Sequence, residues 1–160
     1  MPQSSFIMYD EEYREITAII DRLVREANAA CVYLVDKDGQ LISASGDTRN
    51  IDATSLASLT AGNIAATGGL AKLIGEKEFS ILFHEGERDN IHISVIGQRV
   101  ILVVIFDKRS SLGLVRLRVK RASEELNRTI QKLLGRMEAG MQKEKLLQEI
   151  TDDDIERLFH

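Results

Sequence analysis

Three segments of the chain carry apolar residues at helical spacing. They cover residues 11–28, 53–74 and 112–137, and in each the apolar positions recur every three or four residues. Asp10 and Asp52 precede the first two segments, where an N-cap residue is expected. The pattern therefore predicts three amphipathic helices, the last of which begins after a serine pair.

Five shorter segments are apolar and rich in β-branched residues, which is typical of strands. They cover residues 31–35, 40–45, 79–84, 91–96 and 100–106. The first and last of these lack polar alternation, which indicates strands that are covered on both faces. The order α-β-β-α-β-β-β-α with short connections predicts an α/β fold, in which helices cover both faces of a five-stranded antiparallel sheet.

The C-terminal end departs from this core pattern after Gly140. We therefore expect a single domain over residues 1–138, a linker over 139–150 and an acidic amphipathic tail over 151–160. The tail begins with three aspartates, and its apolar residues are Ile155, Leu158 and Phe159. Such a tail predicts a short helix that is too short to be stable alone. It would dock either on its own domain or on a partner protein.

Composition excludes several classes of function. Of the 160 residues, 44% are hydrophobic and 29% are charged, and the net charge of −4 argues against a nucleic-acid or anionic-membrane partner. The single cysteine excludes an internal disulfide and fits a reducing compartment. The N-terminus does not resemble a signal peptide, and no apolar run approaches the ~20 residues needed to cross a bilayer. These features predict a cytoplasmic protein.

Candidate chemistry is sparse. Residues 36–39 resemble the start of a calcium loop, but Asp47 stands where the loop needs a bidentate glutamate, so a plain turn is expected. His84 and His92 lie on neighbouring predicted strands without a third ligand, and Cys31 lies in an apolar strand without a base. Glycine-rich phosphate loops are absent from the sequence. We therefore expect no metal, no cofactor and no catalytic residue; the enzyme alternative is a small hydrolase that uses the two histidines.

A basic cluster opens the third helix, with Arg116, Arg118, Lys120 and Arg121. At helical spacing these side chains fan around the axis, which is typical of a solvated face or of ion pairs with a partner. The alternative is an arginine finger, a residue that accelerates GTP hydrolysis in a partner GTPase.

The second helix carries two contrasting sides. On a helical wheel, its large apolar residues gather on one side, which predicts that this side faces the sheet. These residues are Leu56, Leu59, Leu70, Leu73 and Ile74. Small residues and one lysine occupy the opposite side: Ala57, Ala61, Ala65, Gly68 and Lys72, with Ser58 and Gly69 beside them.

A solvated face would usually carry charged residues, and two consecutive glycines cost a helix about 2 kcal/mol. Small side chains instead let another backbone come close. This side is therefore interpreted as a protein-binding face, with a helix wholly buried in its own domain as the alternative. Ile64, at the flank, could belong either to this partner-binding face or to a contact between two copies of the chain.

Several segments together resemble MglB proteins, which are bacterial members of the roadblock family. They are residues 50–75, 83–87, 103–107, 111–118 and 152–159. The resemblance covers nearly the whole chain, apart from residues 138–149.

The resemblance implies a sheet of strand order 2-1-5-4-3 and a homodimer in which the third strands pair across the two-fold and the second helices lie side by side. It implies binding to an MglA-like Ras-type GTPase in its GTP state, one GTPase per dimer, in the control of cell polarity and of gliding or pilus motility at a cell pole. Members act as GTPase-activating proteins without an arginine finger, and their acidic C-terminal segment is associated with nucleotide exchange. The alternative within the family is a scaffold that binds a GTPase without activating it.

Five positions of the second helix match the family's helix and lie on its small-residue side, and they are the expected GTPase contact. They are Ala61, Ala65, Gly68, Gly69 and Lys72. A second contact is expected at Ile155, Leu158 and Phe159 of the tail.

Overall fold

The computed structural model describes residues 9–159, apart from the side chains of residues 150–155, 158 and 159. Its elements follow the predicted order. They are α1 (Asp10–Glu26), β1 (Cys31–Asp36), β2 (Leu41–Gly46), α2 (Ala53–Leu73), β3 (Ile81–Glu85), β4 (Asn90–Ile96), β5 (Val100–Phe106) and α3 (Leu112–Phe159).

The strands form one antiparallel sheet of order β2-β1-β5-β4-β3, which confirms the predicted fold class and the strand order that the resemblance implied. Every residue of β1 and β5 is buried, as expected of central strands covered on both faces. β2 and β3 are the outer strands of the sheet. The outward backbone groups of β3 have no strand beside them in the described part of the chain.

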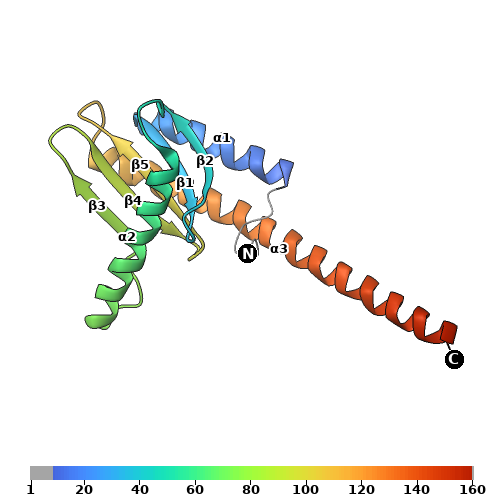
Figure 1. Ribbon diagram of the computed structural model, residues 1–160. Helices are drawn as coiled ribbons and strands as arrows, with labels where there is room; N and C mark the ends of the chain where they lie inside the picture. The colour runs from blue at the N-terminus through green and yellow to red at the C-terminus, as the bar shows by residue number, and fades with distance from the viewer. Residues whose placement is uncertain (1–8, 160) are drawn as a thin grey trace.

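Two layers of helix enclose the sheet (Figure 1). α1 and α3 lie side by side on one face, over a core that includes Ile16, Leu102 and Leu126. α2 crosses the other face alone, over a core that includes Tyr33 and Val103. Successive strand residues point to opposite faces, so β5 contributes to both cores.

The helix ends follow local capping chemistry. The Asp52 side chain accepts a hydrogen bond from the Ser55 backbone N–H at 3.3 Å, which confirms it as the N-cap of α2. Asp10 is the first residue of α1 rather than its cap, because Tyr9 holds the cap position without a side-chain bond. The Ser111 hydroxyl accepts from the Leu114 backbone N–H and opens α3.

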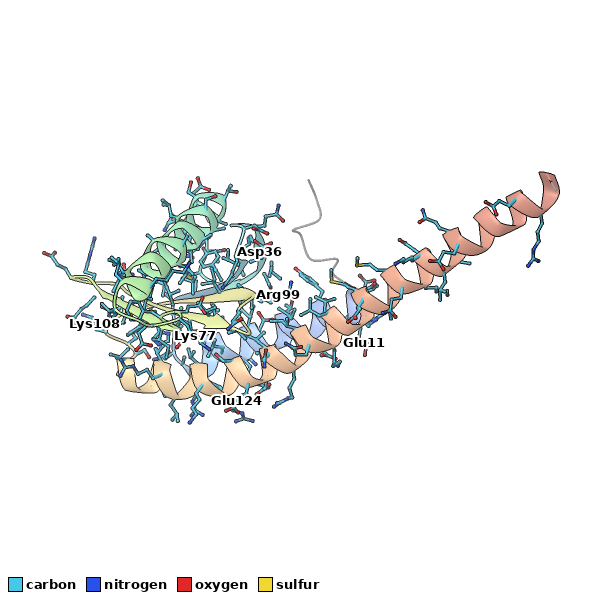
Figure 2. The ribbon with its side chains drawn as sticks, turned by 90° about the horizontal axis from the view of Figure 1, so that it is seen from below. Glu11, Asp36, Lys77, Arg99, Lys108 and Glu124 are labelled. Carbon is cyan, nitrogen blue, oxygen red and sulfur yellow. The ribbon has the colours of Figure 1, made fainter. Side chains whose placement is uncertain are left out.

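α3 is one helix of 48 residues. Its first half packs against α1, and its second half projects from the body of the protein (Figures 1 and 2). The segments expected as a linker and a tail both fall within this helix. Their separation into two functional units stays a prediction.

Candidate partner-binding surface

The side of α2 that faces the sheet lies between the two sides described in the sequence, so the predicted orientation of this helix was wrong. Its buried residues are Ala57, Thr60, Ile64 and Ala71. Of the five large apolar residues predicted to face the sheet, Leu56 is partly buried and packs against the core, and the other four are exposed. The exposed fractions are 73% for Leu59, 58% for Leu70, 81% for Leu73 and 68% for Ile74.

A close approach between α2 and the β1–β2 turn explains this orientation. Gly39 in that turn has φ +91°, and a Cβ added there would lie 3.3 Å from the Ser58 Cα and 3.6 Å from the Ala61 Cβ. Only small residues fit between a helix and a backbone at this separation. The leucines of α2 therefore cannot occupy this side.

The leucine side of α2 borders a hollow of about 460 Å³ beside β3 and β4. Leu59 and Asn63 line it from the helix, and His84 and Ile91 from the sheet. The Asn63 amide nitrogen lies 3.2 Å from the His84 Nε2 and ties the helix to β3. Ile81, at the start of the outer strand β3, is 52% exposed, so an apolar surface extends from α2 towards the edge of the sheet.

On its other side α2 borders a second hollow, of about 510 Å³. All five residues predicted to bind the GTPase line it: Ala61, Ala65, Gly68, Gly69 and Lys72. We call this the small-residue hollow. A Cβ at either glycine would meet no other atom within 4 Å, so packing within this domain does not require glycine there.

Charged residues from two neighbouring loops complete the small-residue hollow. Lys37 and Lys77 line it together with Glu78 and Gln98, and Lys37 Nζ lies 3.0 Å from the Glu78 carboxylate. Together with Lys72 this lining has three positive charges and one negative charge, so it favours acidic groups on a partner. The sequence analysis missed these loop residues, because only the folded chain places them beside α2.

The two histidines do not form a site. His92 pairs with Phe83 and His84 with Ile91 in the β3–β4 register, so the imidazoles lie on opposite faces of the sheet. His92 is 1% exposed, and burial together with the positive charge of Arg116 lowers its pKa. Among the described residues, no group of three His, Cys, Asp or Glu side chains could hold a metal ion.

Cys31 is a packing residue, as predicted. It is 1% exposed in the core beneath α2. Burial raises the pKa of its thiol to about 11, so little thiolate forms at neutral pH.

The basic cluster lies on α3, in the layer opposite α2. Arg116 and Lys120 are exposed, Arg118 is partly buried, and Arg121 pairs with Glu125 at 3.4 Å within the helix. These side chains fan around the helix, as predicted. The sheet separates them from both hollows.

The residues of the expected second contact lie near the end of α3. The backbone of Ile155, Leu158 and Phe159 is helical, but their side chains lie outside the described residues. A tail contact with a GTPase therefore stays a prediction. None of the described helices is long and apolar enough to cross a membrane.

Comparison with known proteins places these features in a family. Residues 15–106 match the Roadblock/LC7 domain. The chain is similar to the solved structure of Myxococcus xanthus MglB, with 62% identity and a TM-score of 0.76 over 79% of this chain and 96% of that one. It is also similar to a structure described as gliding protein MglB from Thermus thermophilus, with 34% identity and a TM-score of 0.74 over 80% of this chain and 97% of that one. The curated proteins contain no match.

Proposed function

Because this chain belongs to the Roadblock/LC7 family, we propose that it is a homodimeric regulator of the MglB type. In this proposal it binds an MglA-like Ras-type GTPase in its GTP state and stimulates GTP hydrolysis. The observation that carries the proposal is the surface of α2, which presents exposed leucines on one side and the small-residue hollow on the other.

The leucine side supports the homodimer. Contiguous exposed apolar surface beside an unpaired edge strand marks a protein–protein contact. Pairing of β3 with β3 of a second copy would satisfy both edges and bring Leu59 and Leu70 of the two copies together. A two-fold contact of this kind is self-complementary.

The small-residue hollow supports the GTPase contact. Ala65 and Gly69 are exposed and leave room for the backbone of a partner, and Lys72 offers it a positive charge. A regulator without catalytic groups can act by binding the hydrolysis-competent conformation of the GTPase more tightly than the others. The catalytic residues then belong to the GTPase.

From the similarity to MglB proteins we further propose that the protein acts in the cytoplasm at a cell pole, in the control of polarity and of gliding or pilus motility. One GTPase per dimer is the expected stoichiometry. The competing function is a scaffold that holds the GTPase without activating it, and an assay of GTP turnover separates the two.

The experiment measures single-turnover GTP hydrolysis by the purified MglA-type GTPase of the same organism, with and without the full-length protein. Stimulation is expected for the native chain and not for the double variant Ala65→Arg and Gly69→Arg, since each substitution fills the hollow with a long charged side chain. Binding without stimulation by the native chain would establish the scaffold.

Gly113→Arg is the matched control. Gly113 is an exposed helical glycine of α3 with no atom within 4 Å of an added Cβ, on the opposite layer from the hollow. This variant should stimulate as the native chain does. Full stimulation by a folded, dimeric double variant at Ala65 and Gly69 would refute the assignment of the hollow.

A further inference from the structure

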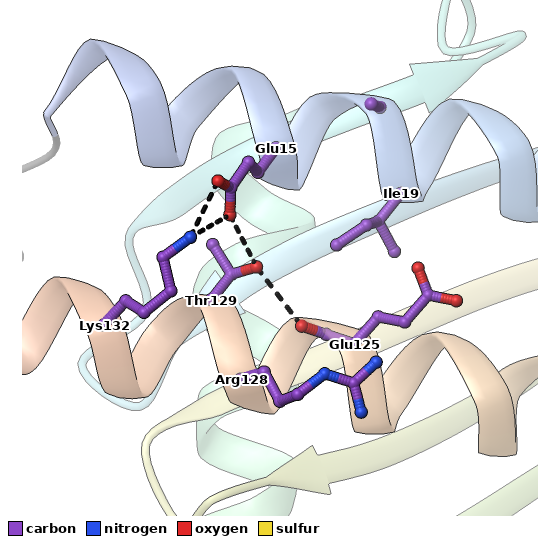
Figure 3. A pocket seen from close by; sticks show the side chains of 7 residues that line it. Glu15, Ile19, Glu125, Arg128, Thr129 and Lys132 are labelled. Carbon is purple, nitrogen blue, oxygen red and sulfur yellow. Dashed lines mark hydrogen bonds and ion pairs between the residues drawn. The ribbon is translucent and has the colours of Figure 1, made fainter.

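α1 and α3 are joined by four ion pairs along the two helices, two of which share Arg136. Arg22 contacts Glu125 and Glu15 contacts Lys132 at 2.8 Å, as Figure 3 shows for the second pair. The other two join Arg136 to Glu12 at 2.7 Å and to Glu11 at 3.7 Å. α3 continues past the end of α1 that carries Glu11 and projects from the body of the protein (Figure 2).

The pair of Glu12 and Arg136 is built differently from the others. The Glu12 carboxylate is 1% exposed, and Arg136 Nη1 donates to both of its oxygens, at 2.8 and 2.7 Å. The guanidinium carbon also lies 4.1 Å from the centre of the Tyr9 ring, a cation–π contact. These hydrogen bonds lower the pKa of Glu12, so the buried carboxylate stays charged and paired at neutral pH. We call Tyr9, Glu12 and Arg136 the latch.

Two glycines flank the latch in the middle of a long helix. Gly135 precedes Arg136, Gly140 follows it by about one turn, and no other glycine occurs between residues 114 and 159. A Cβ at Gly135 would meet nothing within 4 Å, and one at Gly140 only the Tyr9 hydroxyl at 3.7 Å. Close packing therefore does not require glycine at either position. Glycine lowers helix propensity and is a common site of helix bending.

The side chains of the projecting part of α3 are exposed. From residue 138 to residue 149 every residue except Gly140 is exposed, including Met141 at 67% and Leu146 at 59%. Packing therefore does not hold this part straight.

We propose that residues 135–140 form a hinge in α3, and that the latch of Tyr9, Glu12 and Arg136 holds this hinge straight. The hinge sets the reach of the C-terminal segment, so Arg136 is a positioning residue for whatever that segment contacts. Its link to GTPase regulation rests on the function proposed above. The hinge itself can be tested without a GTPase.

The structural test measures the distance between spin labels on α1 and on the projecting part of α3. Ala18→Cys and Lys143→Cys place both labels at exposed positions, and buried Cys31 stays unlabelled at neutral pH. Excess unlabelled protein confines the labels to one protomer of a dimer. The parent should show one narrow distance, and Arg136→Met should broaden it and add shorter distances.

Two further variants separate the latch from general loosening of the helix pair. Lys132→Met removes the neighbouring ion pair and should leave the distance narrow, whereas Arg136→Lys should restore most of the order lost in Arg136→Met. Gly135→Ala with Gly140→Ala should restore a narrow distance even in the Arg136→Met background. An unchanged distance in Arg136→Met, or a broad one that the alanines do not narrow, would overturn the proposal.

The functional test measures release of labelled nucleotide from the MglA-type GTPase. Arg136→Met should alter release in the full-length protein and have no effect once residues 151–160 are removed. An equal effect in both forms would overturn the positioning role. If the native protein binds no GTPase, the proposed function fails, while the distance measurement still decides the hinge.

Discussion

Replacement of Leu59 by aspartate tests whether the leucine side of α2 holds two copies together. Leu59 is 73% exposed in a single copy and lines the hollow beside β3. Burial of a whole leucine side chain contributes ~1.5–3 kcal/mol. The exposed part of Leu59 would therefore contribute about 1–2 kcal/mol on association.

Two-fold symmetry places this residue in the contact twice, so Leu59→Asp removes about 2–4 kcal/mol of association free energy. The dissociation constant should rise about 30-fold to 700-fold. The introduced carboxylates, brought close together without partners, would raise it further. The exposed position predicts little loss of stability in the single copy.

Sedimentation equilibrium over a concentration series measures this change, because one chain weighs 17.9 kDa and the dimer twice as much. The matched control is Leu117→Asp, which makes the same change at a leucine of α3 that is 62% exposed on the opposite layer. A dimer as tight in Leu59→Asp as in the native chain would refute the assignment of this surface. Equal dissociation in both variants would point to general loss of structure.

Three further outcomes are expected. Alanine at Arg116, Arg118 or Arg121 should lower the maximal stimulated rate of GTP hydrolysis by less than tenfold, whereas loss of an arginine finger at saturating protein would cost ~10³ or more. Removal of residues 151–160 should leave the dimer and most stimulation of GTP hydrolysis intact, but it should change the rate of nucleotide release from the GTPase. If binding, hydrolysis and release all stayed unchanged, the proposed tail contact would be wrong. Burial lowers the pKa of His92 in the folded protein. Below pH ~6.5 the unfolded chain therefore binds a proton at this histidine more readily than the folded protein does. The free energy of unfolding should consequently fall as the pH drops below ~6.5. Urea titrations at several pH values measure this, and His92→Leu should flatten the dependence.

The order of elements was predictable because its signals are local. The central strands are continuous apolar runs. α1 has apolar residues at regular helical spacing, and its first turn carries acidic residues. The β3 boundaries were less accurate, at residues 79–84 against Ile81–Glu85, because this outer strand is only partly buried and alternates weakly. The unbroken course of α3 was also missed. Gly140 weakens the helical pattern locally but does not end the helix.

The orientation of α2 could not be read from its residues. α2 carries large or small apolar residues on all of its sides. The periodicity of these residues therefore predicts a helix but does not show which side faces the core. The rule that leucines face the core failed for Leu59, Leu70 and Leu73, because the deciding constraint is the distance to the turn at Gly39, which is set by the folded sheet. The five residues predicted to share one side of α2 do line one hollow, because helical spacing alone places them together.

The exposure of the leucines on α2 strengthens the case for an interaction surface. Leu59, Leu70 and Leu73 contribute little to the stability of a single copy, because each remains more than half exposed. Apolar side chains gathered in this way on a protein surface gain free energy only when another surface covers them. The other side of the same helix leaves Ala65 and Lys72 exposed at the small-residue hollow. A second copy that covers the leucines therefore does not have to cover the hollow, so the two contacts proposed above are compatible on one helix.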